Sequence, residues 1–206
     1  MGNVLNINKK SFLMTTSIGY AALMVLLAVL FFSGTVLAAF PLAGVGGFVV
    51  AAAEIEGQGF QLVPAIGETQ ERSLWPQGAV RLNSVKIKEL NLSKELNVSN
   101  ELGNFGIHKV RIEITTTGDV EGQGVRMNIS GMVADLAEFN NMEVKERRSD
   151  NPLNVLGLQA DSMKLTNPEL NAHSLTTNSI GLPGMKLKII AYDQNGNYVG
   201  GDFDRD

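Results

Sequence analysis

Apolar–polar–apolar triplets recur through most of this chain, and they constrain its fold more than any other feature. The first series comprises Val80-Arg-Leu82, Val85-Lys-Ile87, Leu90-Asn-Leu92 and Leu96-Asn-Val98. A second series runs from Met127 to Val144, and a third from Leu158 to Leu187. The apolar residues of a triplet are two positions apart, which is the period of a β-strand, and the long three- and four-residue spacing of a helix is absent. The sequence therefore predicts a mainly β domain.

The segments between triplets are rich in Asn, Ser, Lys, Glu, Pro and Gly, which favour turns and bends. Two architectures produce this pattern. In a solenoid-like fold, short strands joined by bends form coils that stack on one another. In a curved sheet, longer strands switch their inward face at bulges and form a sandwich, a roll or an open groove. The residues alone leave both architectures open.

A Gly-Gln-Gly segment occurs twice, in Glu54-Ile-Glu-Gly-Gln-Gly-Phe60 and in Asp119-Val-Glu-Gly-Gln-Gly-Val125. Strand-like runs precede both segments, so we expect a strand, a glycine turn and another strand, with a tight turn or bulge that needs positive φ. A phosphate-binding loop at Gly57-x-Gly59 is disfavoured, because no third glycine and no helix follow. The repetition suggests a duplicated structural unit.

One long apolar stretch, Ile18–Ala39, contains no charged residue. At about 1.5 Å per residue its length matches the roughly 30 Å hydrocarbon layer of a membrane. Lys9 and Lys10 precede it, so residues 1–17 are expected to be cytoplasmic and everything after the stretch to lie outside. We expect a single-pass transmembrane helix in the cell membrane. The alternative is a signal peptide cleaved near Ala38 or Ala39, which would leave a secreted protein.

The remaining chain divides by composition. Residues 40–47 read as a Gly/Ala-rich linker, residues 48–192 as one all-β extracytoplasmic domain, and residues 193–206 as a terminal hairpin turn and tail. The chain has 17 Lys and Arg against 21 Asp and Glu, and this acidic balance argues against nucleic acid as a partner. It has no cysteine, which excludes disulfides, thiolate metal sites and cysteine nucleophiles.

No set of residues in the sequence indicates a particular reaction, and we assign no catalytic, cofactor-binding or metal-binding residue. The two histidines are His108, at the start of a strand-like run, and His173, which alternation places opposite Ala172 and toward solvent. A serine hydrolase needs a serine, a histidine and an acid in mutual reach, and the chain has no Gly-x-Ser-x-Gly elbow. His-Glu-x-x-His, the P-loop and the dinucleotide fingerprint are also absent.

Two loops carry residues with an alternative functional interpretation. Lys145–Asn154 breaks the triplet pattern and contains Arg147 and Arg148, which are expected to be solvated but would also suit an anion or a lipid headgroup. A second loop, Gly67–Gly78, holds Trp75, the only tryptophan; we expect it to cap the core, with a membrane or partner contact as the alternative.

The C-terminal Tyr192–Tyr198 segment predicts a hairpin, because Asn195-Gly196 suits a type I′ turn. Asp193, Asn195 and Asn197 alternate like the opening of a calcium loop. Their glycine falls at the fourth position instead of the sixth, and no bidentate Glu follows, which disfavours calcium.

Several of these motifs together resemble a known family. They are Glu56-Gly-Gln-Gly-Phe60, the Val-x-Leu-x-x-Val-x-Ile run from Val80, and Ala-Asp-Ser-x-x-Leu-x-Asn-Pro-x-Leu-x-Ala from Ala160 to Ala172. From about Phe48 to Ile189 the chain is similar to a secreted domain-of-unknown-function family of Gram-positive bacteria whose members are often labelled "cholesterol esterase". The resemblance implies export and supplies no catalytic residues, and the esterase label does not fit the motifs above.

Three functions remain as hypotheses. The first is a membrane-anchored, non-enzymatic envelope protein that binds an apolar ligand or lipid in a groove lined by the triplets, with Ile18–Ala39 as its membrane contact. The second is a cell-surface structural or assembly protein, in which solenoid ends favour oligomerisation. The third is an esterase, which the residues disfavour. No cofactor is expected.

Overall fold

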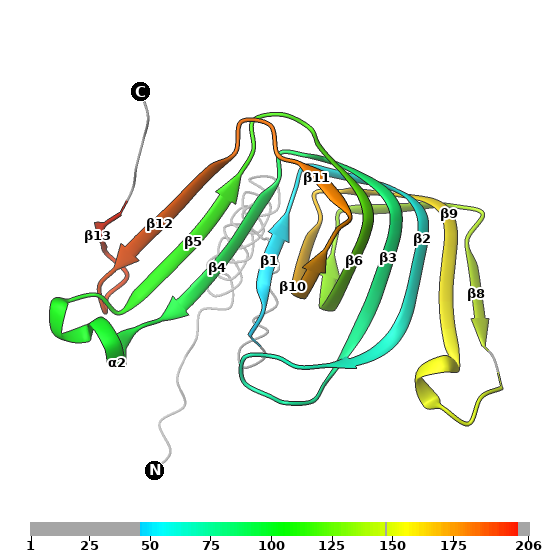
Figure 1. Cartoon of the computed structure of the whole chain (residues 1–206), viewed down its shortest axis with the longest axis horizontal. Helices are drawn as coiled ribbons and strands as arrows, with labels where there is room; N and C mark the ends of the chain where they lie inside the picture. The colour runs from blue at the N-terminus through cyan, green and yellow to red at the C-terminus, as the bar shows by residue number, and fades with distance from the viewer. Residues whose placement is uncertain (1–45, 147, 202–206) are drawn as a thin grey trace, which may run out of the picture. The chain divides into compact units, whose positions relative to one another are not determined.

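The computed structural model describes residues 46–146 and 148–201, and it contains a single 13-stranded antiparallel sheet (Figure 1). A short helix α2 (Ser99–Leu102) and two 3₁₀ turns, η1 (Gly103–Phe105) and η2 (Pro152–Asn154), interrupt the strands. The strands are β1 (Phe48–Ala51), β2 (Glu54–Gly67), β3 (Trp75–Lys88), β4 (Asn91–Asn97), β5 (Lys109–Thr115), β6 (Val120–Val133), β7 (Leu136–Asn140), β8 (Glu143–Glu146), β9 (Leu156–Thr166), β10 (Glu169–Thr176), β11 (Ser179–Gly181), β12 (Lys186–Tyr192) and β13 (Tyr198–Gly200).

Consecutive strands form long bent units. β1 pairs with β4 and β2 pairs with β3 in one continuous register, so Val49 faces Ser93 and Glu54 faces Lys88. β9–β10 pairs with β1–β2 in the same way, and β5–β6 pairs with β3–β4 with a one-residue offset at the corner. Each of these four units bends at a corner between its two strands. Backbone bonds cross the corner line, from Ala53 N to Lys88 O at 3.0 Å and from Asn167 N to Ala53 O at 2.8 Å.

The sheet order forces strong curvature. In the order β13-β12-β5-β4-β1-β10-β6-β3-β2-β9-β7, three strands separate β1 from β2, although only Ala52 and Ala53 link them in the chain. Four interstrand steps of a flat sheet would cover about 19 Å, whereas three Cα steps reach about 11 Å at most. The sheet must therefore curl until β1 and β2 meet, and Figure 1 shows this curl.

This topology decides between the two predicted architectures. The curved-sheet alternative is confirmed. The solenoid alternative is wrong, because every strand pair in the described part of the chain is antiparallel and the neighbours of most strands are distant in sequence.

The core fills the inside of the curl. It contains apolar side chains from β1, β2, β3, β6, β9 and β10, and Val120, Leu165 and Ala172 are fully buried. The inward positions explain the unusual spacing of the triplets. In β3 the buried apolar residues are Val80 and Leu82, then Val85 and Ile87, so two successive outward residues separate the pairs. We call this step, in which two successive residues of a strand face outward, the phase change. It also occurs between Gly57 and Phe60, between Gly122 and Val125, and between Ala160 and Met163.

The Gly-Gln-Gly segments lie at this phase change. Positive φ is confirmed at Gly59 (67°) and Gly124 (61°). The expected turn between two strands is wrong, because β2 and β6 each run straight through their segment and keep their register with both neighbours. The two segments resemble each other because each lies at the phase change of its own strand. No larger repeat is found around them.

Two other local expectations change. Trp75 does not lie in a loop but begins β3, where the guanidinium of Arg72 stacks 4.7 Å from its ring centroid. The C-terminal hairpin of β12 and β13 is confirmed, but its turn is not type I′. Only Gly196 has positive φ, and its N–H bonds to Asp193 O at 3.1 Å, which is a type I turn followed by a left-handed glycine.

Within the described residues no helix has the length and apolarity needed to cross a membrane. The predicted membrane segment Ile18–Ala39, the cytoplasmic residues 1–17 and most of the linker 40–47 lie outside the described residues, as does Arg147.

Candidate functional site

The outer face of the curled sheet carries a row of alternating charges. Glu138, Lys164, Glu56, Lys86 and Glu121 are successive partners across five strands. Opposite charges on directly paired residues stabilise one register over its neighbours.

Glu54, one row closer to the corner, joins this charge network. Its carboxylate contacts Lys164 at 2.8 Å and Lys88 at 2.5 Å. The hydrogen bonds from Lys164 and Lys88 lower the pKa of Glu54 to about 2. Lys164 also contacts Glu56 at 3.2 Å, and Lys86 pairs with Asp119 at 2.9 Å, so both lysines of the row have acidic partners. We therefore assign the row to strand register and not to a ligand site.

Next to the charged row lies a band of polar residues, all neutral except Asp161, which we call the amide band. It occupies the phase change, where each strand turns two successive residues outward. The band consists of Asn140–Asn141, Asp161–Ser162, Gln58–Gly59, Asn83–Ser84, Gln123–Gly124 and Asn178–Ser179. Residues of these types favour turns between strands, and Asn141 and Asn178 do lie between strands, whereas Gln58, Asn83, Gln123 and Asp161 lie within strands. Their alignment across the sheet depends on strand pairing, which has no local sequence signal.

The glycines of the band make room for the amides of neighbouring strands. The side chain of Asn83 lies over Gly59, and that of Asn178 lies over Gly124, each where a Cβ atom would otherwise stand. Asn141 Nδ2 donates a 2.7 Å hydrogen bond to Asp161 Oδ2 on the adjacent strand. The band is therefore an ordered surface in which glycine and amide alternate.

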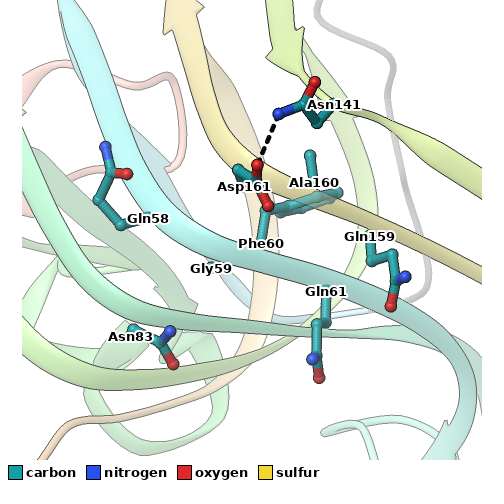
Figure 2. Close-up of a pocket in the computed structure, with 9 residues that line it drawn as sticks. All are labelled: Gln58, Gly59, Phe60, Gln61, Asn83, Asn141, Gln159, Ala160 and Asp161. Atoms are coloured by element: carbon teal, nitrogen blue, oxygen red, sulfur yellow. Dashed lines mark hydrogen bonds between the residues drawn. The ribbon is translucent and has the colours of Figure 1, made fainter.

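A cleft of about 510 Å³ opens in this band around Gly59 (Figure 2). Figure 2 shows polar side chains of β2, β3 and β9, together with Asn141 from the link between β7 and β8, around Gly59. They are Gln58, Gln61, Asn83, Asn141, Gln159 and Asp161. Beneath them Phe60 is buried and packs against Phe139, with ring centroids 5.3 Å apart. The volume lies within the roughly 300–1,000 Å³ of small-molecule sites, and Asp161 is the one charged side chain that lines it.

A second cleft of about 540 Å³ adjoins the first, and Gln61 and Gln159 line both. It carries Glu143, Lys145 and the exposed Arg148 together with apolar residues of β2 and β9. Lys145 pairs with Glu143 at 3.4 Å. The two clefts thus form one elongated depression along β2 and β9.

The strands β4, β5 and β12, which we call the wing, extend beyond the curl. One face of the wing is apolar, because the paired positions across it are Leu92, Ile114 and Leu187 in one row and Leu96, Val110 and Ala191 in another. The intervening row holds Lys94, Ile112 and Ile189. Leu187 and Ile189 are each 52% exposed. The main neighbours of these strands are their own sheet partners, so no described element covers this face.

Polar groups occur at the inner end of the wing face. Lys94 makes no ion pair with any described residue. His173, on β10, is half-buried; burial and then the charge of Lys94 lower its pKa. The expectation that His173 points to solvent is wrong, because the register of β10 against β6 shifts between Ala172 and Ser174 and interrupts the alternation.

The triplets do not line the predicted apolar groove. Their side chains within the curl pack into the core and leave an interior cavity of only about 60 Å³, below the size of a ligand site. The uncovered apolar surface lies on the wing instead.

The remaining candidate residues have local roles. His108 Nδ1 lies 3.2 Å from Ser99 Oγ, which sequence reasoning missed, but the Ser99 hydroxyl is also 3.4 Å from the His108 carbonyl oxygen. No described carboxylate bonds to His108, so no hydrolytic triad forms there. The Asp193 carboxylate accepts bonds from Asn195 N, Asn197 N and Asn197 Nδ2 at 2.8–2.9 Å, which commits it to the hairpin turn.

These features define a curved antiparallel β-sheet protein with a polar depression on its outer face and an uncovered apolar wing. Residues 45–195 match the family of unknown function DUF6230, and the chain belongs to that family. The match carries no esterase label and no indication of bacterial origin. No curated protein and no solved structure matches the chain.

Proposed function

We propose that this chain is an exported, membrane-anchored, non-enzymatic envelope protein that binds membrane lipid through the apolar face of its wing. The observation that carries the proposal is the continuous apolar face of β4, β5 and β12, on which Leu187 and Ile189 are half exposed and the residues of β4 and β5 are partly buried. Contiguous exposed apolar surface of this kind marks a binding surface, because water is expelled from it on contact with lipid.

Charge favours the surface of a bilayer as the occupant. Lys94 stands within the apolar face and has no acidic partner among the described residues. A lysine can lay its aliphatic stem along acyl chains while its ammonium group reaches a lipid phosphate.

The proposed anchor would tether the wing to the membrane. Eight residues, 40–47, separate Ala39 from the first residue of β1, and β1 pairs directly with β4 of the wing. A linker of this length reaches about 30 Å at most. An anchored copy would therefore keep the wing within a short distance of the bilayer.

The absence of cysteine allows a sharp test. Leu187→Cys and Glu95→Cys place single fluorophores on opposite faces of the wing, and both positions are exposed. The full-length variants are placed in nanodiscs of phosphatidylcholine and phosphatidylglycerol with brominated acyl chains. We expect bromine quenching of the label at Leu187→Cys and none at Glu95→Cys. Equal quenching of the two labels, or none at Leu187→Cys, contradicts the proposal.

The other two hypotheses have less support. Assembly was motivated by stackable solenoid ends, and the antiparallel curled sheet has none. Ester hydrolysis lacks an acid beside His108, and His173 has no hydroxyl partner among the described residues.

A further inference from the structure

The cleft in the amide band has an unusual chemical composition for a surface depression. Five of its side chains are neutral amides, namely Gln58, Gln61, Asn83, Asn141 and Gln159. An amide offers two donors and a carbonyl acceptor, so each can bond a group that both donates and accepts. Asp161, whose Oδ2 already accepts from Asn141, adds one further acceptor.

This composition selects among ligand classes. A metal ion would need several carboxylates or histidines, and the described residues hold no group of three. In the amide cleft itself, an anion would be repelled by Asp161, which is the only charged residue lining it. An apolar ligand would contact little apolar surface, because Phe60 is buried below the polar side chains. Hydroxyl groups both donate and accept, and they match the amides.

The shape of the depression favours a chain of such units. The amide cleft of about 510 Å³ continues past Gln61 and Gln159 into the second cleft of about 540 Å³. These two glutamines are direct partners on β2 and β9, so the depression runs across a rigid, paired part of the sheet. We propose that the amide cleft and the adjoining cleft together bind an oligosaccharide, with its hydroxyl groups bonded to the amides around Gly59.

The repeated Gly-Gln-Gly segment supplies a matched pair of variants for the test. Gln58 and Gln123 are the middle residues of the two segments, both are exposed, and both belong to the amide band. Only Gln58 lines the cleft. Replacing either with alanine removes the same side chain from the same kind of strand position, so the two variants differ in the cleft alone.

The full chain in lipid nanodiscs is applied to an array of neutral and acidic oligosaccharides, and the strongest binder is titrated by calorimetry. We expect Gln58→Ala to weaken its affinity by about three- to tenfold, the effect of losing one or two neutral hydrogen bonds. Gln123→Ala should bind like the unaltered chain. Gln61→Ala, at the junction of the clefts, should weaken longer oligosaccharides more than disaccharides.

Three results would overturn the proposal: no saccharide bound, unchanged affinity in Gln58→Ala and Gln61→Ala, or equal loss in Gln58→Ala and Gln123→Ala. Thermal unfolding of each variant separates loss of a contact from loss of the fold. Lipid binding by the wing involves other strands and other residues, so the nanodisc quenching experiment can fail while saccharide binding succeeds, and the reverse.

Discussion

At the scale of single residues, the two positive-φ glycines of the amide band allow the phase change in β2 and β6. Gly59 and Gly124 let β2 and β6 turn two successive residues outward without losing register. Any other residue would strain the backbone there, and its Cβ would meet the amide of Asn83 or Asn178.

We therefore expect Gly59→Ala to lower the free energy of unfolding by about 1–3 kcal/mol, from backbone strain and the displaced Asn83 amide. Gly181→Ala is the control, because Gly181 has no positive φ and no atom lies within 4 Å of the position of its Cβ. Chemical denaturation of both variants measures the difference. A Gly59→Ala protein as stable as Gly181→Ala would show that the bend does not depend on glycine.

The ion pairs of Glu54 give a pH dependence with a defined sign. Because Lys164 and Lys88 hold the pKa of Glu54 at about 2, below its ordinary value of 4.5, the folded state binds this proton less readily than the unfolded state. The stabilisation is complete above about pH 4.5 and is lost as the pH falls toward about 2.

Glu54→Gln should therefore show a shallower decline of unfolding free energy over this acid range than the unaltered chain. Glu101→Gln removes an exposed carboxylate of α2 and should leave the decline unchanged. Urea denaturation at a series of pH values makes the comparison. Parallel curves for Glu54→Gln and the unaltered chain would mean that the ion pairs of Glu54 are not maintained in solution.

At the scale of elements, the strands could be predicted from the sequence, but the pairing of the strands could not. The two-residue period within triplets predicted β-structure correctly, and the five-residue step from Val80 to Val85 reflects a real feature, the aligned phase change. The same step also fits the turns of a solenoid. Only the pairing of Gly78 with Ile129 or of Phe60 with Ala160 separates the two folds, and such non-local pairs leave no local signal.

The candidate cleft could not be predicted from the sequence, for a related reason. Asn83, Asn141 and Asp161 look like turn residues in the chain, because these side chains favour turns. The outward positions of Asn83 in β3 and Asp161 in β9 follow from the phase change, whereas Asn141 does lie between two strands, β7 and β8. The proximity of the three residues follows from strand order. For the Asn195-Gly196 turn, the predicted hairpin was correct but the predicted turn type was wrong. Asn195 keeps negative φ, so the turn is longer than the type I′ form.

At the scale of the described body, curl and wing differ in how they are held. In the curl, β2, β3 and β6 have strand neighbours on both edges and bury one face in the core. In the wing, β12 pairs with β5 on one edge and with the short β13 on the other, and no element among the described residues covers its apolar face. Local stability follows burial and hydrogen bonding, so the two parts should open at different free energies.

We expect amide hydrogen exchange of the full chain to be slowest in β2, β3 and β6 and at least roughly tenfold faster in β12 and β13, because opening the wing exposes little core. The short edge strand β8, which is exposed along its length, should also exchange quickly and serves as an internal reference. Gly59→Ala should speed exchange in β2 and β3 while leaving β12 unchanged. Uniform protection across curl and wing would instead show a single cooperative unit, and the wing could then not respond to lipid independently of the core.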